Sequence, residues 1–106
     1  MLQQQHLKYY QLTEKDIMGY IREYLRYGGW FVVRLFQGLG AYKGISDLVA
    51  IKNGITVWIE CKSLRGTLSK DQQTFAENIK KHGGVYIVAR SIDDLVEQLK
   101  ARAIKP

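Results

Sequence analysis

Residues 47–62 read DLVAIKNGITVWIECK, and this stretch decides the fold. Two apolar runs flank Asn53-Gly54, a dipeptide that favours a type I′ β-turn because both of its central residues adopt positive φ. Counting outward from the turn, one residue at a time on each strand, places Asp47 opposite Glu60. Residues that oppose each other in this way have Cβ atoms about 4.5–5.5 Å apart. The pattern therefore predicts a hairpin with two acidic residues side by side at its open end.

Lys62 follows two residues after Glu60, so the two-residue period of a strand puts both side chains on one face. Two close carboxylates repel each other unless a positive charge lies between them. One candidate is Mg²⁺ or Mn²⁺, because these hard cations prefer carboxylate oxygens. The backbone carbonyl of Cys61 could add a neutral ligand. An ordinary ion pair at the strand end is the alternative, and both interpretations stay open at this point.

The rest of the chain predicts three helices and two further strands. In order, these are a helix from Thr13 to Gly28-Gly29, a strand over 30–36, the hairpin, a helix from Ser69 to His82, a strand over 85–89 and a helix from Ser91. Both hairpin faces are apolar, which places its strands inside a sheet covered on both sides. A right-handed crossover should make the last two strands parallel. The fold class is α/β, with a mixed four-stranded sheet flanked by helices in the order α-β-β-β-α-β-α.

The composition fits one domain over residues 1–106, with its core at about 13–100. The net charge of +6 favours a polyanionic partner, although a merely soluble basic protein has the same charge. The single cysteine excludes an internal disulfide and fits a reducing compartment. No apolar run approaches the roughly 20 residues of a membrane span, and the polar start lacks the apolar stretch of a secretion signal. We expect a soluble, cytoplasmic protein with no membrane partner and no organic cofactor.

Three motifs follow one another at plausible spacing: Gly44-Ile45-Ser46-Asp47-Leu48, Ile59-Glu60-Cys61-Lys62 and Gly66-Thr67-Leu68-Ser69-Lys70-Asp71-Gln72. Together they resemble the VRR-NUC family of the PD-(D/E)xK nuclease superfamily, and the resemblance covers roughly residues 13–99. One departure is Ser46, where the family usually has proline. The resemblance implies a restriction-endonuclease-like core, metal binding by Asp47 and Glu60, and a catalytic Lys62.

The resemblance also bears on two other residues. Related nucleases often place a first-helix glutamate near the metal, and Glu14 matches it better than Glu23, although an acid in the first helical turn is favoured by the helix dipole in any case. Gln72 matches the family's glutamine in the helix after the lysine strand. Because Ser69-x-x-Gln72 is also a capping box, structural and catalytic roles for Gln72 can coexist.

Five residues on or near the loops at this end of the sheet are candidates for nucleic-acid binding: Arg34, Tyr42, Lys43, Arg65 and Lys70. The cations suit phosphate contacts, which are salt-dependent and carry little sequence information. Tyr42 could stack on a base or sugar. Each of the five could equally be an ordinary solvated residue.

Several tyrosines crowd the N-terminal third, namely Tyr9, Tyr10, Tyr20, Tyr24 and Tyr27. Core packing explains some of them, and a homodimer face could explain the rest. Stand-alone members of the resembled family tend to work as dimers, so we expect a homodimer.

The sequence thus predicts a Mg²⁺- or Mn²⁺-dependent endonuclease that hydrolyses DNA, with structured or branched DNA such as junctions or flaps as its substrate. Two alternatives remain. One is a non-catalytic nucleic-acid-binding or assembly module that retains the nuclease core. The other is a nuclease acting on RNA, which nothing in the sequence excludes.

Overall fold

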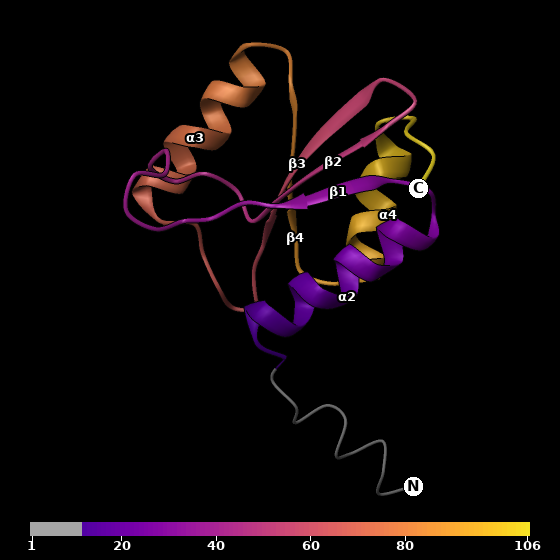
Figure 1. Cartoon of the computed structure of the whole chain (residues 1–106), viewed down its shortest axis with the longest axis horizontal. Helices are drawn as coiled ribbons and strands as arrows, with labels where there is room; N and C mark the ends of the chain where they lie inside the picture. Colours follow the sequence, from indigo (N-terminus) through magenta and orange to yellow (C-terminus); the bar gives the residue numbers. More distant parts are fainter. Residues whose placement is uncertain (1–11) are drawn as a thin grey trace, which may run out of the picture.

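The computed structural model describes residues 12–106, so the prediction for Tyr9 and Tyr10 lies outside the described residues. The elements are α2 (Glu14–Tyr27), β1 (Phe31–Arg34), β2 (Leu48–Lys52), β3 (Ile55–Cys61), α3 (Lys70–Lys81), β4 (Val85–Ala89) and α4 (Ile92–Ala101) (Figure 1). This is the predicted order α-β-β-β-α-β-α, and it confirms the α/β class with a restriction-endonuclease-like arrangement.

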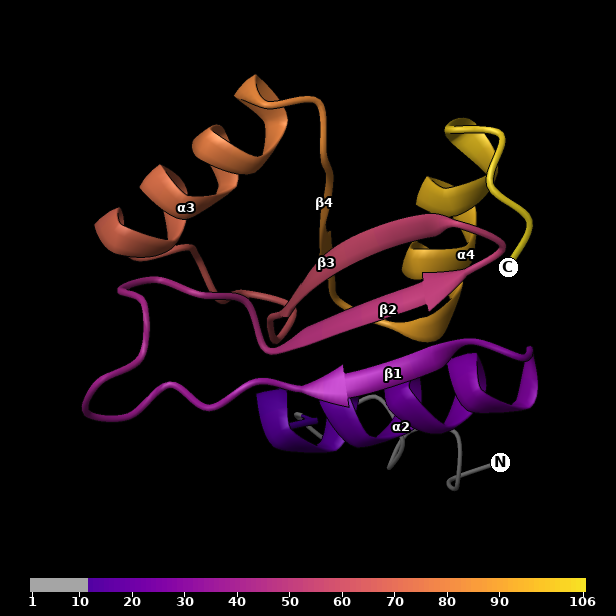
Figure 2. The same ribbon diagram turned by 45° about the horizontal axis from the view of Figure 1, so that its top comes forward.

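The four strands form one sheet in the order β1-β2-β3-β4. The pairs β1–β2 and β2–β3 are antiparallel, and the arrows of β1 and β2 point in opposite directions in Figure 2. The pair β3–β4 is parallel. The hairpin register is the predicted one, with Leu48 opposite Ile59. At the turn, Asn53 has φ 51° and Gly54 has φ 79°, as a type I′ turn requires. The hairpin prediction is confirmed.

The helices begin where their capping residues predict. The hydroxyls of Thr13, Ser69 and Ser91 each accept a hydrogen bond from a backbone N–H in the first turn of their helix. Such a bond satisfies one of the N–H groups that a helix start leaves unpaired. These caps fix the start of α2 and α3, and both helices deliver a side chain to the site described below.

The first strand is shorter than the sequence suggested, because β1 covers Phe31–Arg34 and not the whole of 30–36. Trp30 is buried, and its backbone N–H donates to the Leu25 carbonyl at 3.0 Å, so Trp30 closes the end of α2. At the other end, the Leu35 N–H donates to the Asp47 carbonyl and the ladder stops there. The apolar pattern alone could not reveal that the neighbouring strand begins only at Leu48.

The two faces of the sheet are covered unequally. Helices α2 and α4 pack on one face, and they enclose the main core, which includes Leu48, Ile59 and Ile87 (Figure 1). Helix α3 packs against β4 on the other face, over a smaller cluster around Phe75. The β1–β2 part of that face stays open, and Ile51 is 39% exposed there. The expectation of a sheet covered on both sides is therefore met on one face and only partly on the other.

Candidate active site

The acidic pair lies at the end of the hairpin away from the turn. Asp47 immediately precedes β2, and Glu60 follows Ile59 near the end of β3. The N–H of Cys61 donates to Asp47 Oδ2 at 2.8 Å, so the aspartate carboxylate reaches across to the neighbouring strand. The fold therefore brings the two acids together at one end of the sheet.

Asp47 is held by hydrogen bonds to both carboxylate oxygens. Besides the Cys61 N–H on Oδ2, the amide of Gln37 donates to Oδ1 at 3.0 Å and to the Ile45 carbonyl at 2.9 Å. Burial raises the pKa of the Asp47 carboxyl, and these two hydrogen bonds partly oppose that rise. Gln37 was absent from the sequence prediction. Its only signal there was its place at the start of the glycine-rich loop, which says nothing about where its side chain ends.

Glu60 is the most buried acid of the cluster, at 1% exposure. Gln72 Nε2 donates to its Oε2 at 3.1 Å, and Lys62 Nζ lies 3.7 Å from the same oxygen. Burial raises the pKa of Glu60 to about 8; the Asp47 charge adds to the rise, and Lys62 opposes it. Glu60 Oε1 is buried and has no hydrogen-bond partner among the described residues. This orphaned oxygen is the atom that a cation would satisfy.

Lys62 connects the hairpin to the first helix. Its ammonium lies between two carboxylates, 3.7 Å from Glu60 Oε2 and 3.9 Å from Glu14 Oε1. The Lys62 side chain is only 10% exposed, whereas that of Glu14 is 46% exposed. Glu14, in the first turn of α2, is thus brought to the cluster. Glu23 instead lines a surface hollow with Lys15 and Tyr20.

Gln72 combines the two roles that its sequence context allowed. Its Oε1 accepts from the Ser69 N–H at 2.9 Å, which completes the capping box of α3. Its Nε2 donates to Glu60. Because a carboxamide has an acceptor at one end and donors at the other, one side chain fixes both the helix start and the carboxylate.

The donor set fits a hard cation with few protein ligands. Within residues 12–106, no three side chains of His, Cys, Asp or Glu are grouped to hold a metal. Asp47 and Glu60 supply two carboxylates, and Mg²⁺ usually keeps several waters beside one or two such groups. The Cys61 side chain is fully buried in the core, so only its backbone carbonyl could serve as a ligand.

The predicted nucleic-acid-binding residues are exposed, and within the described part of the chain none of the four cations among them forms an ion pair with the acids of the site. Arg34 ends β1, Arg65 lies in the loop after Lys62, and Lys70 begins α3. Lys43 lines a hollow beside the first turn of α3. The ring of Tyr42 packs on Phe75 at a centroid distance of 5.8 Å, and 66% of the residue is exposed, so stacking on a base or sugar stays a prediction.

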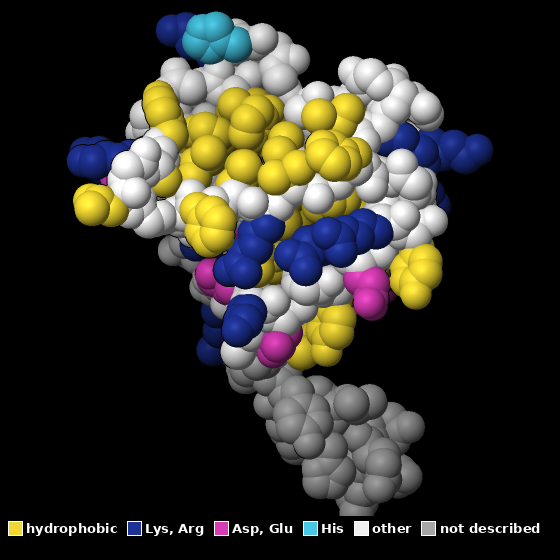
Figure 3. All heavy atoms as spheres, viewed as in Figure 1, with side chains coloured by type: hydrophobic (Ala, Val, Ile, Leu, Met, Phe, Trp, Pro, Cys, Tyr) yellow, Lys and Arg dark blue, Asp and Glu magenta, His cyan; other side chains and the backbone are white. Residues whose placement is uncertain are grey.

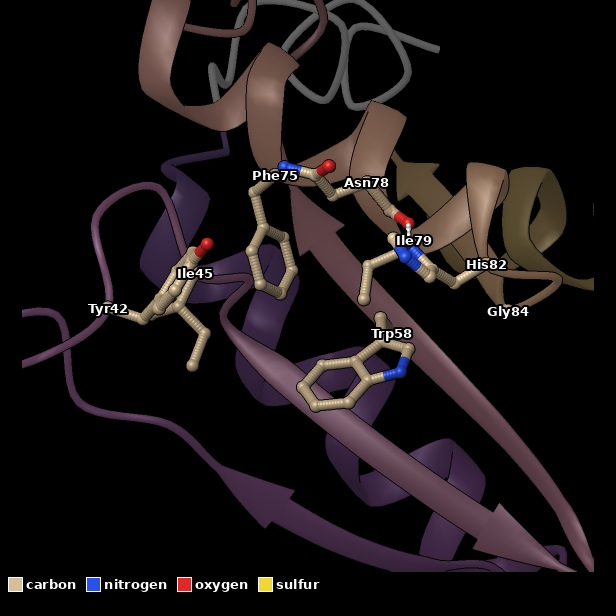
Figure 4. Close-up of a pocket in the computed structure, with 8 residues that line it drawn as sticks. All are labelled: Tyr42, Ile45, Trp58, Phe75, Asn78, Ile79, His82 and Gly84. Carbon is tan, nitrogen blue, oxygen red and sulfur yellow. Dashed lines mark hydrogen bonds between the residues drawn. The ribbon is translucent and has the colours of Figure 1, made fainter.

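An apolar cavity of about 470 Å³ opens on the face of the sheet that α3 covers, beside this helix. Figure 4 shows Tyr42, Phe75 and Trp58 around it, from three different segments of the chain. In Figure 3, apolar side chains form a patch over the sheet between α3 and the hairpin. Neither Asp47 nor Glu60 lines the cavity.

Comparison with known families supplies one match. The family described as archaeal Holliday junction resolvase (hjc) matches residues 14–91, which span α2 to the residue before α4 and include the whole candidate site. Curated proteins and solved structures gave no match. No helix within residues 12–106 is long and apolar enough to cross a membrane.

The matched family is a nuclease family of the PD-(D/E)xK type, so the superfamily expected from the motifs is confirmed. Membership of the VRR-NUC branch stays a prediction. Because the match covers well over half of the residues and contains every charged group of the site, the chain belongs to the archaeal Holliday junction resolvase (hjc) family.

Proposed function

We propose that this chain is a divalent-metal-dependent endonuclease that cuts DNA at four-way junctions. The observation that supports it most directly is the convergence of Asp47, Glu60 and Lys62 at one end of the sheet in a chain of the resolvase family. Among the described acids, Asp47 and Glu60 combine burial, raised pKa values and hydrogen bonds from backbone or carboxamide N–H groups. Perturbed carboxyls of this kind are typical of functional sites.

In this proposal, Asp47 and Glu60 hold a Mg²⁺ or Mn²⁺ ion, with Glu14 and the Cys61 carbonyl as further oxygen ligands. When bound, the ion supplies an activated water and neutralises charge on the phosphate. Gln37 and Gln72 keep the two carboxylates in their ligand orientation, because each donates an N–H to one of them.

Lys62 has a separate task. Its ammonium lies beside Glu60 and is mostly shielded from solvent, so it can orient the attacking water and stabilise negative charge that develops at phosphorus. Gln72 donates to the same Glu60 oxygen that faces Lys62 and limits the rotation of the carboxylate. The expected substrate contacts come from the exposed cations Arg34, Lys43, Arg65 and Lys70, with Tyr42 stacked on a base or sugar.

The proposal includes a homodimer. Separating a four-way junction requires cuts in two strands, and each chain supplies one set of catalytic residues. The open apolar face beside α3 gives a second copy a surface to cover, and Ile79 lies half-buried at its edge. In a sedimentation experiment, Ile79→Lys should give a monomer that loses paired cuts. Tyr27→Lys, on the exposed side of α2, tests the alternative tyrosine face and should leave the dimer intact.

A panel of labelled DNAs tests the function. Four-way junction, flap, nicked duplex, duplex and single strand are incubated with Mg²⁺, with Mn²⁺ or with chelator, beside an RNA of matched structure. We expect metal-dependent cleavage that is fastest on the junction. Binding without turnover in any metal would support a non-catalytic module, and preferred cleavage of the RNA would support the alternative substrate.

A further inference from the structure

The loop that follows Lys62 is held by one side chain. Arg90 Nη1 donates to three backbone carbonyls of this loop: Ser63 at 2.6 Å, Gly66 at 2.7 Å and Leu64 at 3.3 Å. Bonds from a charged guanidinium are stronger than those between neutral groups. The arrangement therefore clamps the loop against the end of β4.

The clamp itself has a fixed base. Arg90 directly follows β4, and its backbone N–H donates to Asp94 Oδ2 in the first turn of α4 at 2.9 Å. One residue earlier, the Ala89 carbonyl accepts from the Lys62 N–H at 3.1 Å. Strand β4 thus anchors the backbone of Lys62 through Ala89 and the loop after Lys62 through Arg90.

The clamped loop forms a wall of the candidate active site at Gly66. A Cβ atom built on Gly66 would lie 2.9 Å from Glu14 Oε2 and 3.4 Å from Lys62 Cδ, so the loop backbone packs directly on both side chains. The position of the Lys62 ammonium depends on this packing. Its distances to Glu60 and Glu14 are longer than those of tight ion pairs, so the two carboxylates alone do not fix it. Contact with the loop backbone accordingly limits where the ammonium can lie.

Little else holds the loop in place. Leu64 is 81% exposed, and Arg65 is also exposed. Within the loop, the Gly66 N–H donates to the Ser63 carbonyl. Among the described residues, no other group from outside the loop donates to the carbonyls that Arg90 binds. Loss of the guanidinium would therefore release the loop from β4 without disturbing the core.

We propose that Arg90 is a positioning residue: by clamping the Ser63–Gly66 loop, it sets the place of the Lys62 ammonium relative to Glu60 and Glu14. This inference rests on the proposed nuclease function for its catalytic consequence. Its structural content, the confinement of Lys62, can be measured without any cleavage.

The cleavage test compares Arg90→Met and Arg90→Lys with the wild type on a four-way junction. Arg90→Met should lower kcat by about 10²-fold, because small displacements of a catalytic group have effects of this size. The Kd for the junction should rise much less than kcat falls, because Arg65 is the one proposed phosphate contact that lies in the released loop and Arg90 itself is not such a contact. Arg90→Lys keeps a charged donor and should recover part of kcat. Arg102→Met, which removes an exposed arginine at the C-cap of α4 that donates to the Gln98 carbonyl, is the matched control and should cleave normally.

Thermal unfolding of each variant shows that it is folded. A folded Arg90→Met variant with the wild-type kcat would overturn the proposal. So would a variant whose whole loss lies in the Kd for DNA.

Lysine labelling makes the inference independent of the function. Reductive methylation, read by peptide mass spectrometry, should modify Lys62 several times faster in Arg90→Met than in the wild type or Arg102→Met. Lys52, whose ammonium donates to the Gly28 carbonyl at 2.6 Å, is an internal reference that should not change. An unchanged Lys62 rate would overturn the positioning role. If the wild type cleaves no nucleic acid, the proposed function fails, and the labelling result still decides whether Arg90 confines Lys62.

Discussion

The two faces of this sheet are built from the same strands but have different roles. On the α2–α4 face, alternate side chains such as Leu48, Ile59 and Ile87 are fully buried in one apolar core. On the α3 face, the intervening positions include Glu60 and Trp58, and they carry the polar cluster, the cavity and the partly open apolar surface. The α2–α4 face thus contains the main apolar core. The α3 face also buries a carboxylate, Glu60, whose burial opposes its ionised form and points to a function.

The largest effect should come from the charged groups of the α3 face. Lys62→Ala and Glu60→Gln should each lower cleavage of a junction by about 10³-fold, the loss typical of a group that stabilises transition-state charge. Binding of the junction, measured by gel shift, should change little, because neither side chain is exposed. Lys80→Ala, an exposed lysine in the last turn of α3, is the control. Wild-type cleavage by either site variant would remove that residue from the mechanism.

Substitutions on the α2–α4 face should lower the free energy of unfolding more than substitutions on the open part of the α3 face. Leu48→Ala should lower the free energy of unfolding by about 2–5 kcal/mol, because it leaves a cavity in the closed core. Ile51→Ala, three residues along the same strand but on the open face, should cost about 1 kcal/mol or less. Urea denaturation measures both. Similar losses for the two variants would mean that the open face is covered in solution, as a dimer would cover it.

The pH dependence of stability should also trace to the α3 face. Because the pKa of Glu60 is raised from 4.5 to about 8, the folded chain binds more protons than the unfolded chain between these values. The free energy of unfolding should therefore fall as the pH rises through this interval. Glu60→Gln should flatten the slope, and Glu77→Gln, an exposed acid on α3, should not.

Added Mn²⁺ provides a second test of the predicted titration of Glu60. A cation on Asp47 and Glu60 favours their ionised forms, so it should stabilise the wild type most at the high-pH end of the interval. The Glu60→Gln variant should gain less from the metal. A slope that is the same in wild type and Glu60→Gln would show that Glu60 is not the group that titrates.

The smallest effect should come from the cap of α3. Ser69→Ala should cost about 1 kcal/mol of stability, because the Gln72 backbone N–H loses its bond to the Ser69 hydroxyl. It should also slow cleavage slightly, because a looser start of α3 weakens the bond from the Ser69 N–H to Gln72 Oε1 that orients Gln72 towards Glu60. Thr74→Ala, in the same helix, removes only a bond to the Lys70 carbonyl and should leave cleavage unchanged. Equal cleavage by Ser69→Ala and the wild type would separate the capping role of Gln72 from its role in the site.

Much of the α3 face could be predicted, since its key residues lie near local signals. The Asn53-Gly54 turn set the hairpin register, and the register brought Asp47 and Glu60 together. The capping residues located the helix starts that carry Glu14 and Gln72. Gln37 and Arg90 could not be predicted, because their partners are eight to 27 residues away and no periodic pattern links them.

The sequence by itself determined the elements, their order and the pairing of the hairpin, because turn chemistry, caps and side-chain alternation act over a few neighbouring residues. Only the tertiary structure decided how far β1 extends, which part of the sheet α3 leaves open, and which carbonyls Arg90 binds. These features depend on where segments distant in the chain pack against one another. Burial of Glu60, and with it the raised pKa of its carboxyl, is likewise a property of that packing and of no single motif.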